Sequence, residues 1–116
     1  MSSNAVVFAW NRPLPGRETT SASHFQEFLA FLAEQKKSGL IESFDTVLLE
    51  PHGGKFNGFF LVRGEPAKLA QLAGDADWIQ HQIRADLHLD GFASLRGVTG
   101  AAVEERMGLW MKELPR

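Results

Sequence analysis

Histidine is the residue type in this sequence best suited to acid–base chemistry near neutral pH, and His24 has the most informative position. Ser23 and Gln26 have the spacing of a capping box, which predicts that a helix starts here. The positive end of a helix disfavours the imidazolium form, so His24 is expected to be neutral. A neutral imidazole can act as a general base if an acid orients it. His24 is therefore a candidate base, and the alternative is a surface histidine in a first helical turn.

Four polar residues further along the chain recur at helical spacing: Asp77, His81, Arg84 and His88. Seven residues separate the two histidines, a rise of roughly 10.5 Å, which is too far for them to share one metal ion without other ligands. The sequence contains no H-E-x-x-H motif, so no metal site is predicted. We expect a solvated polar face, opposite an apolar face made by Ile79, Ile83 and Leu87.

Aromatic side chains in the expected strands indicate a second kind of site. An aromatic sheet face with an arginine at its margin can line a pocket for a small apolar or carboxylate-bearing molecule. The candidate ligand-binding residues are Phe8, Trp10, Phe59 and Arg63. The alternative is that the aromatic residues form the packed core of a dimer.

Several other chemistries are excluded by what the sequence lacks. It has no cysteine, which removes disulfides, thiolate metal sites and cysteine nucleophiles. His52 precedes Gly53-Gly54, but no G-x-S-x-G motif accompanies it, so a hairpin tip is expected. Gly53-Gly54-Lys55 lacks the spacing of a P-loop, and the other glycines form no dinucleotide fingerprint. We therefore expect no cofactor.

The elements that must position these residues follow from hydrophobic periodicity and turn residues. Helices are expected from Ser23 to Gly39, from Pro66 to Gly74, from Asp75 or Asp77 to about Leu87, and after Gly100. The last helix carries an apolar stripe made by Val103, Met107, Trp110, Met111 and Leu114. The segment 14–22 is expected to be a loop. Strands are expected over residues 5–10, 44–49, 56–62 and 92–98.

The length and the order of these elements predict one domain over residues 1–116. The order is β-α-β-β-α-β with an extra C-terminal helix, which predicts an α+β, ferredoxin-like fold with an antiparallel sheet. Strand 5–10 is apolar on both faces, whereas a sheet covered on one face alternates apolar with polar residues. A partner subunit or the terminal helix is therefore expected to cover the second face.

Over residues 5–98 the sequence resembles the dimeric α/β-barrel superfamily, in which two ferredoxin-like subunits pack their sheets together. It is also similar to the YCII-related branch, through Ser23-His24-Phe25 at the first helix and through Leu72-Ala73-Gly74-Asp75-Ala76-Asp77-Trp78. The resemblance implies a homodimer that binds a small molecule, with His24 as a base and Asp75 or Asp77 as its partner. Members of the superfamily include enzymes and proteins with no established activity, so the resemblance does not decide whether this chain is an enzyme.

Two alternatives share the same topology. Val7-Phe8-Ala9-Trp10-Asn11 and Lys55-Phe56-Asn57-Gly58-Phe59-Phe60 partly resemble the two signatures of RNA-recognition motifs. That resemblance implies single-stranded RNA stacked on Phe8 and Phe59. The net charge of -2 argues against it, so nucleic acid is not the expected partner. The other alternative is a non-catalytic structural or interaction protein.

The location expected from the sequence is cytoplasmic. No apolar run approaches the roughly 18 residues that a membrane helix needs. The Ser2-Ser3-Asn4 start also lacks the basic residues of a leader peptide, so no membrane partner is expected.

Overall fold

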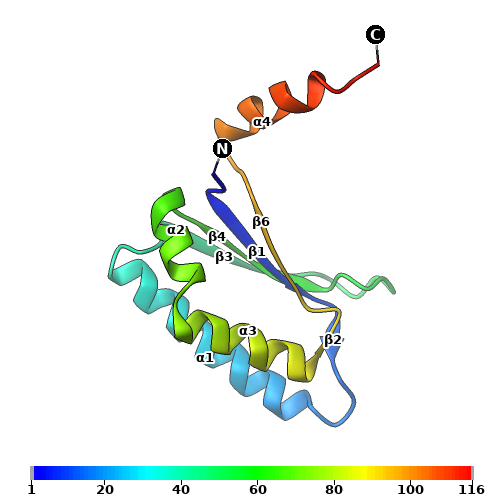
Figure 1. Ribbon diagram of the computed structural model, residues 1–116. Helices are drawn as coiled ribbons and strands as arrows, with labels where there is room; N and C mark the ends of the chain where they lie inside the picture. The colour runs from blue at the N-terminus through cyan, green and yellow to red at the C-terminus, as the bar shows by residue number, and fades with distance from the viewer. Residues whose placement is uncertain (1, 116) are drawn as a thin grey trace.

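The computed structural model describes residues 2–115 and has an α+β architecture, with a four-stranded antiparallel sheet and helices packed against it (Figure 1). The strand order is β3-β4-β1-β6, and a separate short pair joins β2 to β5. The strands are β1 (Ala5–Trp10), β2 (Arg12–Pro13), β3 (Ser43–Leu48), β4 (Gly58–Arg63), β5 (Leu89–Asp90) and β6 (Ala93–Gly97). The helices are α1 (Glu18–Lys37), α2 (Pro66–Ala73), α3 (Ala76–His88) and α4 (Ala102–Met111).

The core lies between the sheet and the pair of helices α1 and α3. Because side chains alternate along a strand, Val6, Phe8 and Trp10 of β1 point to the helix side. Phe8 pairs in register with Phe60 of β4 and stacks on Phe28 of α1 at a centroid distance of 4.4 Å. Aromatic contacts of this kind bury large areas and hold α1 against the centre of the sheet.

Helix α1 begins five residues before the expected start at Ser23. Its N-cap is Arg17, which makes no side-chain capping bond, so the capping box expected at Ser23 and Gln26 is wrong. The Glu18 carboxylate instead accepts the Gly16 N–H and orders the entry to the helix. His24 consequently lies in the second turn of α1, where the dipole of the helix end has faded.

The other helix boundaries follow the residues that indicated them. Gly39 has φ +83° just beyond α1, the left-handed conformation that favours glycine after a helix. Pro66 is at the start of α2, and the Asp75 carboxylate accepts the Asp77 N–H as the cap of α3. These signals act locally, which is why they could be recognised in the sequence.

The face that α3 buries differs from the one expected. Ile79, Ile83 and Leu87 are 43%, 56% and 65% exposed, whereas Trp78 and Ala85 are 2% and 0% exposed. The expected solvated face is wrong for its two histidines, which share the inward face of α3 with Trp78 and Ala85, whereas Asp77 and Arg84 are exposed as expected. Trp78 offers more apolar area than any isoleucine, and its contacts with Phe8 and Phe28 set the rotation of the helix.

The second face of the sheet is open. Its central cross-strand row is Asp45, Leu61, Val7 and Leu95, and Leu95 is 60% exposed. The terminal helix α4 extends away from the body beyond β6, and none of its residues is buried (Figure 1). Within residues 2–115, no helix is long and apolar enough to cross a membrane.

The burial of the core predicts that two leucines contribute very differently to the free energy of unfolding. Leu32 of α1 is 0% exposed, so Leu32→Ala should lower the free energy of unfolding by about 2–5 kcal/mol. Leu87→Ala removes the same atoms from an exposed site and should change it by roughly 0.5 kcal/mol or less. Urea denaturation of both variants measures the difference, and equal losses would contradict this placement of α1.

Candidate functional site

A pocket of about 320 Å³ opens between the first turns of α1 and the helix side of the sheet. Its wall is largely aromatic, with Phe8, Trp10, Phe25, Phe28 and Phe60. The polar residues of its lining, which we call the polar wall, are Glu18, Ser21, His24 and His88. An apolar cavity with a few convergent polar groups is the usual form of a small-molecule site.

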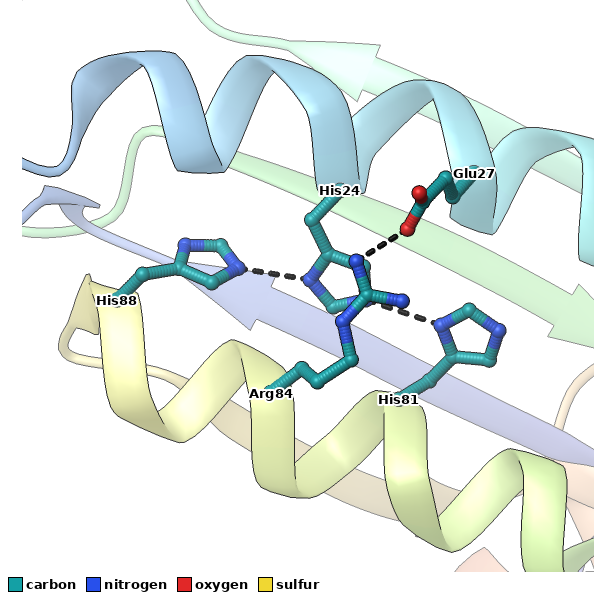
Figure 2. A network of polar contacts seen from close by, with 5 residues as sticks. All are labelled: His24, Glu27, His81, Arg84 and His88. Atoms are coloured by element: carbon teal, nitrogen blue, oxygen red, sulfur yellow. Dashed lines mark hydrogen bonds and ion pairs between the residues drawn. The ribbon is translucent and has the colours of Figure 1, made fainter.

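Two of these residues belong to a group of three histidines that we call the histidine cluster: His24 from α1, with His81 and His88 from α3 (Figure 2). His24 Nδ1 lies 2.7 Å from His88 Nε2, and His24 Nε2 lies 2.9 Å from His81 Nδ1. Both ring nitrogens of His24 therefore have an imidazole partner. His88 Nδ1 in turn lies 2.6 Å from the Ser21 hydroxyl.

The surroundings of the cluster keep its imidazoles neutral. His24 and His88 are 3% and 4% exposed, and the Phe31 ring packs against His81 at a centroid distance of 4.6 Å. Burial, and secondly the nearby Arg84 charge, lower the pKa of His24 to about 4. The same two causes, in the same order, lower the pKa of His81 and of His88. Desolvation disfavours a charged imidazole, which explains the common direction.

Arg84 and Glu27 form an ion pair between α3 and α1 beside the cluster. Figure 2 shows Arg84 reaching from α3 across to Glu27, on the side where the ring of His24 lies. Their side chains are 45% and 54% exposed, so water weakens the attraction between them. The ion pair holds the positive charge of Arg84 close to the imidazoles.

The structure does not bring the expected aspartates to His24. Asp75 is occupied as the cap of α3. Asp77, in the first turn of α3, lies near His81, whose pKa its charge tends to raise. Because His88 and His81 occupy both nitrogens of His24, a histidine pair takes the place that the family resemblance gave to a carboxylate.

Two of the expected ligand-binding residues also lie elsewhere. Phe8 and Trp10 line the pocket, whereas Phe59 and Arg63 point to the open face of the sheet. There Phe59 stacks on Phe56, and Arg63 binds Asp45 at 2.6 Å. The alternation of β4 places Phe60 in the pocket instead of Phe59.

The same alternation bears on RNA binding. Phe8 is 3% exposed beneath α1, and Phe59 is on the other face of the sheet, so the two rings cannot stack on one strand of RNA.

His52 lies away from the site, between β3 and β4. It contacts the Phe56 carbonyl at 2.7 Å and accepts the Gly54 N–H, which are the contacts of a turn.

Sequence reasoning missed Ser21, His81, His88 and Phe60 as site residues. Ser21 fell in the segment expected to be a loop, and the two histidines on the face expected to be solvated. One signal was present, since Trp78, His81, Ala85 and His88 also recur at helical spacing and include a large aromatic residue. No group of three or more metal-binding side chains among residues 2–115 has an arrangement that could hold a metal ion.

Comparison with known proteins adds no identity to this geometry. No family model, no curated protein and no solved structure matches the chain. The function has to be argued from the site itself.

The histidine cluster predicts that the fold loses stability in mild acid. An unfolded histidine titrates near pH 6.5, and the pKa of folded His24 is about 4, so the unfolded state binds more protons between these values. The contribution is fully present above about pH 6.5 and falls as the pH drops towards 4. Urea denaturation across this range measures the slope.

Two glutamine variants identify the source of that slope. His24→Gln keeps a hydrogen-bonding side chain but cannot titrate, so it should flatten the dependence of unfolding free energy on pH. His52→Gln removes an exposed histidine of the turn and should leave the slope unchanged. Equal slopes in the wild type and His24→Gln would contradict the assignment.

Proposed function

We propose that this protein binds a small, largely apolar molecule in the pocket between α1 and the sheet, and that the histidine cluster carries acid–base chemistry there. One observation supports the proposal above the others. The aromatic pocket has a single polar wall, and that wall is the end of a buried row of neutral imidazoles.

The charges of the pocket define the class of ligand further. No lysine or arginine occurs among the described residues of its lining, and Glu18 contributes a carboxylate. A carboxylate-bearing ligand was expected because Arg63 would bind it, but Arg63 is on the other face of the sheet. An uncharged aromatic or alicyclic molecule with a hydroxyl or enolisable carbonyl group fits better, because Ser21 and His88 can exchange hydrogen bonds with it.

The acid–base part of the proposal depends on the state of the imidazoles. A neutral imidazole has a free electron pair and can accept a proton at neutral pH. The Ser21 hydroxyl lines the pocket and lies 2.6 Å from His88 Nδ1, so it can pass a proton from the ligand to His88. A purely structural protein of the same fold would have no use for this pocket, so ligand binding distinguishes the two functions.

Filling the pocket tests this function. Ala22 is exposed on α1 and lines the pocket, so Ala22→Trp should occupy it without disturbing the core. A chlorophenol is a suitable probe, with binding measured by calorimetry. Ala22→Trp should weaken its binding at least about tenfold, or roughly 1.4 kcal/mol.

Ala30→Trp is the matched control, because Ala30 is exposed on the same helix outside the pocket lining. It should bind the probe like the wild type. Failure of the wild type to bind phenols, cyclic ketones or related neutral rings would overturn the proposed function and favour a structural or interaction protein.

We also propose that the chain is a ferredoxin-like domain that forms a homodimer through the open face of its sheet. Both long connections, from β1 to β3 and from β4 to β6, contain helices, and each skips one strand of the order β3-β4-β1-β6. The open face is apolar at its centre, and its charged pair Arg63–Asp45 is neutral as a unit. A second copy can therefore cover it without repulsion between like charges.

Light scattering tests the dimer. The wild type should have a mass near twice 12.9 kDa, and Leu95→Glu should reduce it to that of one chain, because a charge would be buried between the sheets. Leu87→Glu alters an exposed leucine of α3 and should remain dimeric. A wild-type monomer at all concentrations would refute this arrangement.

A further inference from the structure

The histidine cluster joins two separate hollows of the molecule. At one end is the aromatic pocket, which Ser21 and His88 reach. At the other is a second hollow of about 240 Å³, lined by Phe31, Asp77, Gln80, His81 and Arg84. Between these ends run three consecutive hydrogen bonds, from Ser21 to His88, from His88 to His24 and from His24 to His81.

Hydrogen bonding imposes one direction on this row. A neutral imidazole has one N–H donor and one bare nitrogen acceptor. His24 must therefore donate to one neighbouring histidine and accept from the other. If it accepts from His88 Nε2–H, His88 Nδ1 is bare and the Ser21 hydroxyl must donate to it. His24 then donates to His81 Nδ1, which leaves the proton of His81 on Nε2.

The reverse order is the only other arrangement for neutral rings. In it His81 Nδ1–H donates to His24, His24 Nδ1–H donates to His88, and His88 Nδ1–H donates to Ser21. One arrangement becomes the other when a proton shifts along each hydrogen bond, one proton enters at Ser21 Oγ and one leaves His81 Nε2. Distances of 2.6, 2.7 and 2.9 Å are short enough for such shifts without movement of the backbone.

We propose that Ser21, His88, His24 and His81 form a proton relay that connects the ligand pocket to solvent at the outer hollow. This inference rests on the proposed function, since the proton comes from a ligand in the pocket. It assigns distinct roles along the row. Ser21 touches the ligand, His88 and His24 pass the proton, and His81 exchanges it with water.

The transfer balances without any other reactant. The ligand O–H or C–H bond breaks and its proton binds Ser21 Oγ, while the Ser21 proton moves to His88 Nδ1. His88 Nε2 gives its proton to His24 Nδ1, His24 Nε2 gives its proton to His81 Nδ1, and His81 Nε2 releases one to water. All three rings end neutral with the opposite tautomer. The ligand keeps the electron pair, and the reverse shift returns a proton to it.

The charges around the row favour an exit at His81. Arg84 of α3 disfavours a proton on any of the three rings, and Arg17 adds to this at His88. Glu27 of α1 favours a proton at both His24 and His81, and Asp77 of α3 favours one at His81, whose side chain is also more exposed to solvent than those of the other two. Glu18 lies on the pocket wall at the other end. Arg84 also lines the outer hollow, but there Asp77 lies near His81 and the ring is partly exposed, whereas His24 and His88 are buried.

The tautomers of the imidazoles test the relay directly. In protein labelled with ¹⁵N-histidine, long-range proton–nitrogen spectra show which ring nitrogen carries the proton. At neutral pH the wild type should show one common tautomer for His24, His81 and His88. Ser21→Ala removes the donor at the pocket end and should change the ring signals of His81, which lies at the far end of the row.

A variant that interrupts the row at His24 distinguishes the relay from a structural effect. In His24→Gln the response of His81 to Ser21→Ala should be lost, and His52→Gln should leave it intact. Addition of a chlorophenol should move the signals of His81 in the wild type but not in His24→Gln. Each variant is measured at a probe concentration that saturates it by calorimetry, because His24 lines the pocket and its substitution can weaken binding.

The outcomes distinguish the relay from the proposed function. If the phenol does not bind to the wild type, the proposed function fails, while the Ser21→Ala response still tests the coupling of the row. If the phenol binds but His81 does not respond to it or to Ser21→Ala, the relay is refuted and the pocket remains. Mixed tautomers among the three rings would also refute it. If His24→Gln does not fold, Ser21→Ala alone decides the question.

Discussion

The contact between α1 and α3 is the constraint on which the site depends, and at its centre are imidazoles. Loss of the hydrogen bond of a buried polar group destabilises a fold by about 1–3 kcal/mol. His24 and His88 are buried, so the fold depends on their hydrogen-bond partners. These bonds are directional and fix how far α3 is rotated and shifted along α1. The same rotation places Trp78 against the aromatic core. Packing and hydrogen bonding therefore select one arrangement of the helix pair.

The pocket is a continuation of the core and not a separate feature. Phe8, Phe28 and Phe60 are nearly inaccessible and form the floor of the pocket, while their other sides pack within the core. Trp10 and Phe25 extend this aromatic surface towards the opening. Because close-packed rings hold the floor, the polar wall faces a surface of fixed shape. A ligand would meet a largely preformed site.

Local signals of the sequence predicted much of the fold and little of the site. The apolar run of β1, Pro66 at α2 and the Asp75 cap of α3 each act within a few residues. The start of α1 has no such signal, since Arg17 makes no capping bond. The partners of His24 are on another helix, and their position depends on which stripe of α3 turns inward. From hydrophobicity alone, the stripe with Ile79, Ile83 and Leu87 was expected to be buried. The stripe with the larger Trp78 side chain is buried instead.

That choice of stripe bears on function. Burying Ile79, Ile83 and Leu87 would gain about 25 cal/mol for each Å² of apolar surface removed from water, with no polar group to satisfy. The fold instead leaves these three largely exposed and turns inward the stripe with Trp78, Ala85 and the two histidines. Trp78 supplies the apolar area on this stripe, and the neutral imidazoles beside it can accept and donate protons at neutral pH. The proposed acid–base function requires such groups, whereas a purely structural contact between two helices does not.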